Sequence, residues 1–258
     1  MTTQRIQGRV FGEVADEYDR VRPGYPAELA ADVLAYAGGP ALEVGAGTGK
    51  ATELFAATGI DVVATEPDPA MAAVLARRTA GRPNVTVTVS TFEEYVPERA
   101  FGLLYCAQAW HWVDKVVRWQ RAAAALAPGG GLALFWNADW PADEGVTARL
   151  LAAHERFAPH IRPNTGPIGR PVGEEAGARE WAAEVGLPAE FGDLGTRLYR
   201  SGRTVSAADY VALLSTQSSY RLLAEDVREN LFGTLLDTLG DQVVLNVETV
   251  LYLARHLP

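Results

Sequence analysis

Cysteine and histidine are scarce in this sequence of 258 residues. The single cysteine, Cys106, excludes an internal disulfide and fits a reducing compartment. Metal sites need cysteine, histidine or carboxylate ligands clustered at short spacings. The four histidines are scattered, at positions 111, 154, 160 and 256. We therefore expect no metal centre and a cytoplasmic location.

Long apolar runs and basic tracts are also missing. No stretch of about 18 apolar residues occurs, so we expect no membrane span. The N-terminus lacks the charged start and apolar core of a secretory signal. A net charge of −9 without a Lys/Arg run disfavours long-range attraction to nucleic acid. A small molecule or a protein is the favoured partner, and the sequence leaves the oligomeric state open.

The most informative segment that is present spans residues 41–49. A short apolar run contains Glu43 and leads into three alternating glycines. This order suits a strand entering a tight loop, because glycine allows positive φ and lets a ligand approach the backbone. The next apolar run, residues 61–66, ends in Glu66, which is placed to accept hydrogen bonds from a ribose diol. Together they predict a nucleoside cofactor at the top of an α/β sheet.

The glycine spacing helps to distinguish between cofactors. It is Gly-x-Gly-x-Gly, whereas dinucleotide folds carry Gly-x-Gly-x-x-Gly. A pyrophosphate prefers helix N-terminal amides without a neighbouring carboxylate. Glu43 instead suits a ligand with positive charge, such as the sulfonium and ammonium of S-adenosylmethionine (SAM). An NAD(P)-dependent oxidoreductase and a non-catalytic SAM-binding regulatory protein are the alternatives.

Several ordered segments resemble the class I SAM-dependent methyltransferases, in their methyltransferase type 11-like form. Residues 43–49 resemble the first motif, 65–71 the second and 126–132 the turn before the fifth strand. Residues 11–26 and 110–114 are similar to the trans-aconitate methyltransferase-like subgroup, which acts on small molecules. The resemblance implies transfer of a methyl group from SAM to oxygen, nitrogen or carbon of a small organic acceptor. S-adenosylhomocysteine would be the product.

Strand and helix patterns alternate up to residue 136, which predicts an α/β fold. We expect a Rossmann-like, doubly wound, seven-stranded and mostly parallel sheet. Strands are expected at residues 41–44, 61–65, 85–89, 101–107, 132–136, 197–199, 204–205 and 243–254. Helices are expected at residues 10–18, 27–37, 50–58, 115–126, 143–157, 174–185, 207–214 and 224–239, and a further helix, up to Arg78, is expected to begin at Pro67 or Pro69.

Four segments are expected along the chain. Residues 1–39 form an N-terminal helical segment that covers the cofactor site, and residues 40–139 form the SAM-binding core. Residues 140–219 form a helical substrate lid inserted after strand five. Residues 220–258 supply a C-terminal helix and the last strand of the core. A lid of this kind would control access, because ligands bind beyond the carboxyl ends of the strands.

The resemblance and the residue types together give a set of site residues. Glu66 is assigned to the ribose hydroxyls, and Met71 and Phe92 to the adenine. The expected cofactor-binding residues are Tyr18, Arg22, Tyr25, Glu43, Gly45, Ala46, Gly47, Thr48, Gly49, Glu66, Pro67, Met71, Thr91, Phe92, Glu93, Gln108, Ala109 and Trp110. Trp112, Trp140 and Tyr220 are expected to contact the substrate.

His111 is the candidate general base, because an imidazole titrates near neutral pH. The alternative is that His111 and its neighbouring tryptophans only pack against the cofactor. Methyl transfer mainly requires alignment of the acceptor with the methyl group, and a base matters only for a protonated acceptor. The sequence leaves the acceptor and its pathway open.

Overall fold

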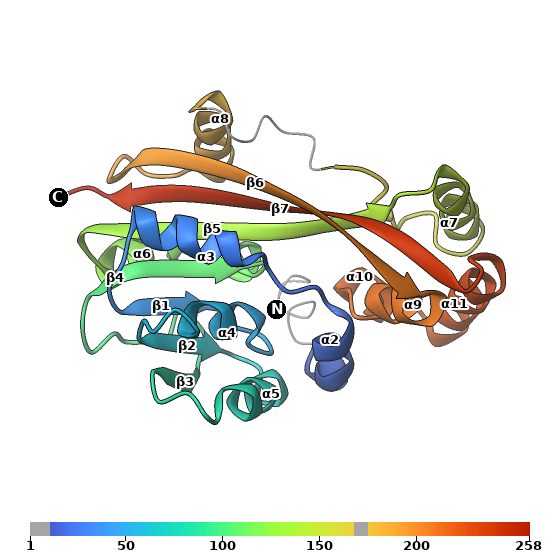
Figure 1. Ribbon diagram of the computed structural model, residues 1–258, viewed down its shortest axis with the longest axis horizontal. Coiled ribbons are helices and arrows are strands. Elements are labelled where there is room, and N and C mark those ends of the chain that lie inside the picture. The colour runs from blue at the N-terminus through green and yellow to red at the C-terminus, as the bar shows by residue number, and fades with distance from the viewer. Residues whose placement is uncertain (1–10, 168–174) are drawn as a thin grey trace. The chain divides into compact units, whose positions relative to one another are not determined.

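The computed structural model describes residues 11–167 and 175–258 (Figure 1). Their helices and strands are η1 (Gly12–Val14), α2 (Ala15–Val21), α3 (Ala27–Tyr36), β1 (Ala41–Val44), α4 (Lys50–Ala56), β2 (Val62–Glu66), α5 (Pro69–Thr79), β3 (Val85–Val89), β4 (Phe101–Ala107), η2 (Trp110–Trp112), α6 (Arg118–Ala125), β5 (Leu126–Pro141), α7 (Glu144–Phe157), α8 (Glu175–Val185), β6 (Phe191–Ser206), α9 (Ala207–Ser215), α10 (Ser218–Arg221), α11 (Glu225–Thr238) and β7 (Gln242–His256). Within these two described ranges, no helix is long and apolar enough to span a membrane.

The strands form one seven-stranded sheet in the order β3-β2-β1-β4-β5-β7-β6. β1 pairs in parallel with β2 and β4, β2 with β3, and β4 with β5. β7 points in the opposite direction to its neighbours β5 and β6 (Figure 1). The expected seven-stranded, mostly parallel sheet is therefore confirmed.

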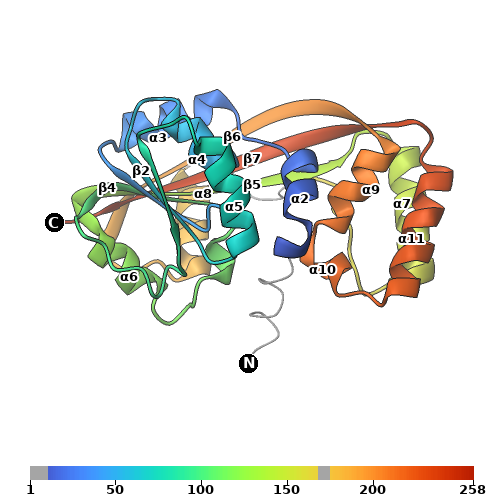
Figure 2. The ribbon, with the colours of Figure 1, turned by 90° about the horizontal axis from the view of Figure 1, so that it is seen from below.

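The chain divides into two compact units. Unit 2 comprises residues 24–137, 170–199 and 249–258. In this unit α3 and α4 lie on one face of the sheet, and α6 and α8 lie on the other (Figure 2). All four residues of β1 are buried, as expected for parallel strands that are covered on both faces.

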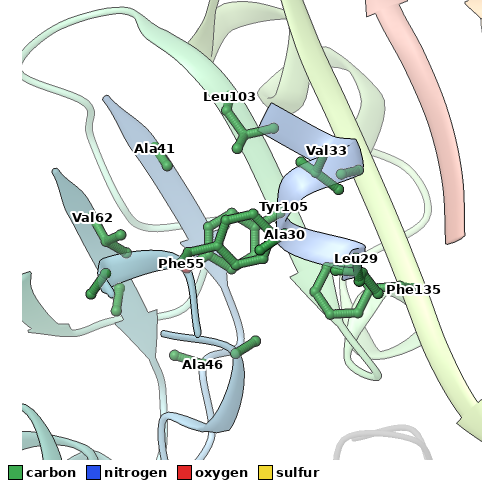
Figure 3. Close-up of a cluster of buried hydrophobic side chains, with 14 of the residues drawn as sticks. Leu29, Ala30, Val33, Ala41, Ala46, Phe55, Val62, Leu103, Tyr105 and Phe135 are labelled. Carbon is green, nitrogen blue, oxygen red and sulfur yellow. The ribbon is translucent and has the colours of Figure 1, made fainter. Parts of the chain in front are cut away.

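The core of unit 2 joins α3 and α4 to the central strands (Figure 3). Phe55 of α4 stacks on Tyr105 of β4, with ring centroids 4.1 Å apart. Phe135 of β5 extends the stack, 6.3 Å from the Tyr105 ring. Leu29 and Val33 of α3 are fully buried in the same cluster. This packing fixes the strands whose carboxyl ends carry the predicted site.

Unit 1 comprises residues 1–23, 138–169 and 200–248. Its helix α11 packs on α7 and α9, and α2 also packs on α9. Leu150, Leu214 and Leu231 belong to its buried core. Each of the strands β5, β6 and β7 contributes residues to both units.

Side-chain caps set the start of several helices. Asp68 accepts hydrogen bonds from the amides of Ala70 and Met71 at the start of α5, where Pro69 occupies the first turn. Asp143 caps α7 and Ser206 caps α9 in a similar way. These local signals explain why the predicted starts of the three helices agree closely with the observed ones.

The late strands differ from the sequence expectation. The two short strands expected at residues 197–199 and 204–205 form one strand, β6. β6 mixes polar, glycine and apolar residues without a regular pattern, which gives a weak local signal, and its pairing with β7 completes it. β5 is also longer than expected, because residues 126–131 pair with β4 through an irregular register instead of forming a free turn.

The boundaries of the two units also differ from those of the expected segments. The expected lid, residues 140–219, is divided, since α8 and the first part of β6 group with unit 2. The expected C-terminal segment is divided as well, because α11 groups with unit 1 and β7 ends in unit 2. Long-range packing decides both groupings, and the covering and lid roles stay predictions.

Candidate functional site

The loop after β1 has the backbone that its glycines were expected to allow. Gly45, Gly47 and Gly49 have φ values of 68°, 59° and 93°, a region that side chains with a Cβ rarely adopt. Ala46 and Thr48, between them, are buried. Thr48 Oγ1 is buried and has no hydrogen-bond partner within the described ranges. The loop therefore presents backbone and one unsatisfied hydroxyl.

Close packing also leaves no room for a Cβ at two of these positions, Gly45 and Gly49. A Cβ on Gly45 would lie 2.5 Å from the Ala109 Cβ. A Cβ on Gly49 would lie 2.5 Å from Leu75 Cδ1. Both distances are far below normal carbon–carbon contact, so the loop lies directly against the segment after β4 and against α5.

Glu66, at the end of β2, joins the glycine loop to the start of α5. Its Oε2 accepts a hydrogen bond of 2.8 Å from the Gly47 amide, and its Oε1 accepts one of 2.9 Å from the Asp68 amide. Burial raises the pKa of Glu66 to about 7, although both amide bonds oppose this shift. Each carboxylate oxygen has a further lone pair, so the group retains acceptor capacity for a ribose.

Glu43 lies below the loop and is fully buried. Its Oε2 accepts hydrogen bonds from Thr52 Oγ1, at 2.6 Å, and from the Tyr105 hydroxyl, at 3.0 Å. Burial raises its pKa to about 8; the charge of Glu66 adds to the shift and the two hydrogen bonds reduce it. The expected role of Glu43 toward a positively charged ligand stays a prediction.

Met71 and Pro67 flank the loop in different ways. Met71, in the first turn of α5, is buried, and its terminal methyl lies 3.7 Å from where a Cβ on Gly47 would be. Pro67 is exposed between β2 and α5. Their contacts with the cofactor stay predictions.

The segment after β3 is tied to the segment after β4. Glu93 Oε1 accepts a hydrogen bond of 2.7 Å from the Asp114 amide, and Arg121 donates to the Glu93 carbonyl. Thr91 Oγ1 donates to Glu94. Thr91 and Glu93, both expected to bind the cofactor, therefore already have protein partners.

Trp110 is almost fully buried, beside Phe92 and Trp119, with ring centroids 6.0 and 5.1 Å away. The Arg118 guanidinium lies 5.9 Å from its ring centroid. Its indole Nε1 has no hydrogen-bond partner in the described part of the chain. This environment gives Trp110 a packing role, and its expected contact with the cofactor stays a prediction.

Gln108 has φ 64°, which is unusual for a residue with a side chain. Its amide donates to the Phe135 carbonyl at 2.9 Å, and its Nε2 donates to the Asn137 carbonyl at 3.2 Å. The following residue, Ala109, is the one that contacts Gly45. The end of β4 is thus held in a strained conformation beside the glycine loop.

His111 is exposed and its ring lies 4.5 Å from the Trp112 ring, centroid to centroid. Partial desolvation, followed by the charge of Lys115, lowers its pKa. The imidazole is therefore neutral at pH 7 and able to accept a proton. Its role as a base stays a prediction.

The expected residues of the N-terminal segment are divided between the units. Tyr18 and Arg22 belong to unit 1 and Tyr25 to unit 2. The Arg22 guanidinium lies 5.0 Å from the Tyr18 ring centroid, and its Nε donates to Thr216 Oγ1 at 2.8 Å. Tyr25 packs edge-to-face on Phe135 at 4.9 Å.

Two of the expected substrate residues, Trp140 and Tyr220, lie in unit 1. Trp140 is half-buried near the end of β5. Tyr220 is 1% exposed, and its hydroxyl lies 2.7 Å from His154 Nε2. Its ring lies in the core of unit 1, beside His154 of α7 and Phe232 of α11, and its expected contact with substrate stays a prediction.

The sequence does not predict the residues that hydrogen-bond the expected site residues and hold them in place. Thr52 and Tyr105 hold Glu43, Asp68 holds Glu66, and Asn137 holds Gln108. Asp68 carried a visible signal, since Asp before proline is a common helix start. The other three have no local signal, because their partners are distant in sequence.

Comparison with known proteins shows a matching domain and several similar proteins. Residues 42–134 match the family model described as a methyltransferase domain. An uncharacterized methyltransferase of Mycobacterium tuberculosis is 40% identical over 136 residues, which are 52% of this chain and 55% of that protein. The chain thus matches about half the length of that relative. A trans-aconitate 2-methyltransferase of Methylobacterium radiotolerans is 30% identical over 202 residues, 77% of this chain and 64% of that protein.

The fold is shared with a solved structure from Anaeromyxobacter dehalogenans, of a protein assigned as a type II methyltransferase. The TM-score is 0.66 at 22% identity, over 92% of this chain and 99% of that chain. At this identity the likeness concerns the fold alone. The chain therefore shares the fold of that methyltransferase structure, and its residues 42–134 match a methyltransferase domain.

Proposed function

We propose that the protein is a SAM-dependent methyltransferase that methylates a small organic acceptor. The observation that carries the proposal is the bond from the Gly47 amide to Glu66, which joins a backbone loop of positive φ to a buried carboxylate. Such a pair supplies close backbone approach and a ribose acceptor at one edge of the sheet.

The residues present fit the cofactor. The loop has no side chain at Gly47 to obstruct a ligand, and Thr48 Oγ1 is buried and unsatisfied within the described ranges. The Glu66 carboxylate, which bonds the loop amide of Gly47, is unfavourable beside a pyrophosphate, and this disfavours an NAD(P)-dependent oxidoreductase. SAM supplies an activated methyl group, so the protein's task is to bind, orient and exclude water.

His111 is the candidate base for an acceptor that must lose a proton, and Trp112 and Trp140 are candidate substrate contacts. Trans-aconitate, the compound named in one relative, is the first acceptor to test. We also propose a cytoplasmic location, which the single cysteine supports.

Calorimetric titration with S-adenosylhomocysteine, SAM and NADH tests the proposal. We expect micromolar binding of the first two, at least tenfold weaker in Glu66→Gln and unchanged in Glu98→Gln, a control at an exposed carboxylate. Binding of NADH alone would refute the proposal. Binding without methyl transfer to any acceptor in a screen would favour the non-catalytic alternative.

A further inference from the structure

The side chain of Asn137, in β5, makes two hydrogen bonds that join distant segments. Its Nδ2 donates to the Gly24 carbonyl at 3.0 Å. Its Oδ1 accepts from Thr249 Oγ1 of β7 at 2.6 Å. One amide thus connects β5 to the segment before α3 and to β7, and all three residues lie in unit 2.

These three positions have a common topological property. Gly24, Asn137 and Thr249 are each the residue at which a segment of unit 2 begins or ends. The Asn137 amide therefore bonds the last residue of β5 that belongs to unit 2 to Gly24 and to Thr249. The two bonds require one donor and one acceptor in defined directions, which an amide supplies and a carboxylate does not.

The backbone of Asn137 carries a third bond, and this one leads to the glycine loop. Its carbonyl accepts the hydrogen bond of 3.2 Å from Gln108 Nε2. Gln108 has a positive φ and needs such support, because this backbone conformation is unfavourable for a residue with a Cβ. Its neighbour Ala109 lies so close to Gly45 that a Cβ there would be 2.5 Å away.

We propose that Asn137 is a positioning residue of the cofactor site. Its side chain, bonded to Gly24 and Thr249, holds the carbonyl that supports Gln108, and Gln108 keeps Ala109 against Gly45. The inference rests on the proposed function, since it concerns the loop assigned to SAM. Asn137 itself is not assigned a contact with cofactor or substrate.

The test measures the affinity for S-adenosylhomocysteine by calorimetry, together with the melting temperature of each variant. Asn137→Asp replaces the donor facing the Gly24 carbonyl by an acceptor, and Thr249→Val removes the hydroxyl at nearly equal volume. We expect each to weaken binding about tenfold. Thr249→Ser, which keeps the hydroxyl, is expected to restore the wild-type affinity. Asn164→Asp is the matched control, because Asn164 Nδ2 also donates to a carbonyl, that of Asp139, but lies in unit 1.

A double-mutant cycle tests whether the effect passes through Gln108. If it does, Asn137→Asp adds less than threefold to the loss in a Gln108→Leu background, because the supported side chain is already gone. Affinity within twofold of wild type in both Asn137→Asp and Thr249→Val would overturn the proposal, as would full additivity in the cycle. Absence of binding by the wild-type protein would overturn the proposed function as well, so the two failures are distinguishable.

Discussion

The Gly47 amide donates a hydrogen bond of 2.8 Å to Glu66 Oε2. Glu66, which is predicted to bind a ribose, thus also holds the backbone of the glycine loop at Gly47. The ionisation state of Glu66 therefore affects both the loop and the ligand.

We expect cofactor affinity to depend on pH through Glu66. Burial raises its pKa to about 7, and ribose hydroxyls donate to the ionised form, so binding is weakened wherever the group is protonated. Affinity for S-adenosylhomocysteine should rise about tenfold between pH 6 and pH 8 and then level off. Calorimetry across this range measures it, and Glu66→Gln should lose the slope. An equal slope in wild type and variant would contradict the assignment.

Glu43 is expected to reduce the stability of the protein at high pH. Its pKa is raised to about 8 by burial, above the ordinary value of the unfolded chain, so its ionisation destabilises the fold as pH rises between these two values. Glu43→Gln keeps an oxygen for Thr52 and Tyr105. We expect the variant to gain about 1–3 kcal/mol in unfolding free energy at pH 9 and almost nothing at pH 5. Urea unfolding at both pH values measures the difference, and a gain independent of pH would point to another cause.

Gly45→Ala and Gly59→Ala separate backbone strain from crowding. Both glycines have positive φ, 68° and 91°. A Cβ on Gly59 would meet nothing within 4 Å, whereas one on Gly45 would meet Ala109 at 2.5 Å. We expect Gly59→Ala to cost about 1–2 kcal/mol, and Gly45→Ala about 1–3 kcal/mol more. Unfolding free energies measure this, and equal costs would show that Ala109 moves aside.

The His154–Tyr220 pair should make unit 1 sensitive to acid. His154 Nδ1 lies 2.7 Å from the Leu150 carbonyl, which only accepts, so Nδ1 carries the hydrogen and Nε2 accepts from Tyr220. Burial lowers the pKa of His154. The neutral imidazole therefore stabilises the fold fully above about pH 6.5, and this contribution is lost as pH falls below it.

Tyr220→Phe tests the pair, because it leaves Nε2 without its donor. The expected cost at pH 8 is about 1–2 kcal/mol of unfolding free energy. Thermal unfolding measures it against Tyr95→Phe, which removes a hydroxyl from a different, partly exposed ring. Equal costs in the two variants would leave the hydrogen bond without a measurable contribution.

The sequence predicts best where the signal is local. The β-branched run Val85–Val89 is strand β3, and Asp68 with Pro69 begins α5 as expected. The positive φ of the loop glycines also follows from their spacing. In each case neighbouring residues determine the conformation, so the pattern is readable without the fold.

Prediction fails where partners are distant in sequence. β6 was expected as two fragments because its polar residues become a strand through pairing with β7. The hydrogen bond of Tyr220 could not be predicted, because its partner His154 is 66 residues away. No local pattern predicts the hydrogen bonds of Asn137, because its partners, Gly24 and Thr249, are 113 and 112 residues away.

The strand order has a consequence for synthesis. β5 can pair with β4 once both have emerged from the ribosome, but its other neighbour, β7, begins more than a hundred residues after β5 ends. At roughly 5–20 residues per second, the nascent chain carries β5 as an unpaired edge for at least several seconds. The methyltransferase domain at residues 42–134 is complete in that interval, while the sheet that contains it is still open to pairing with another chain.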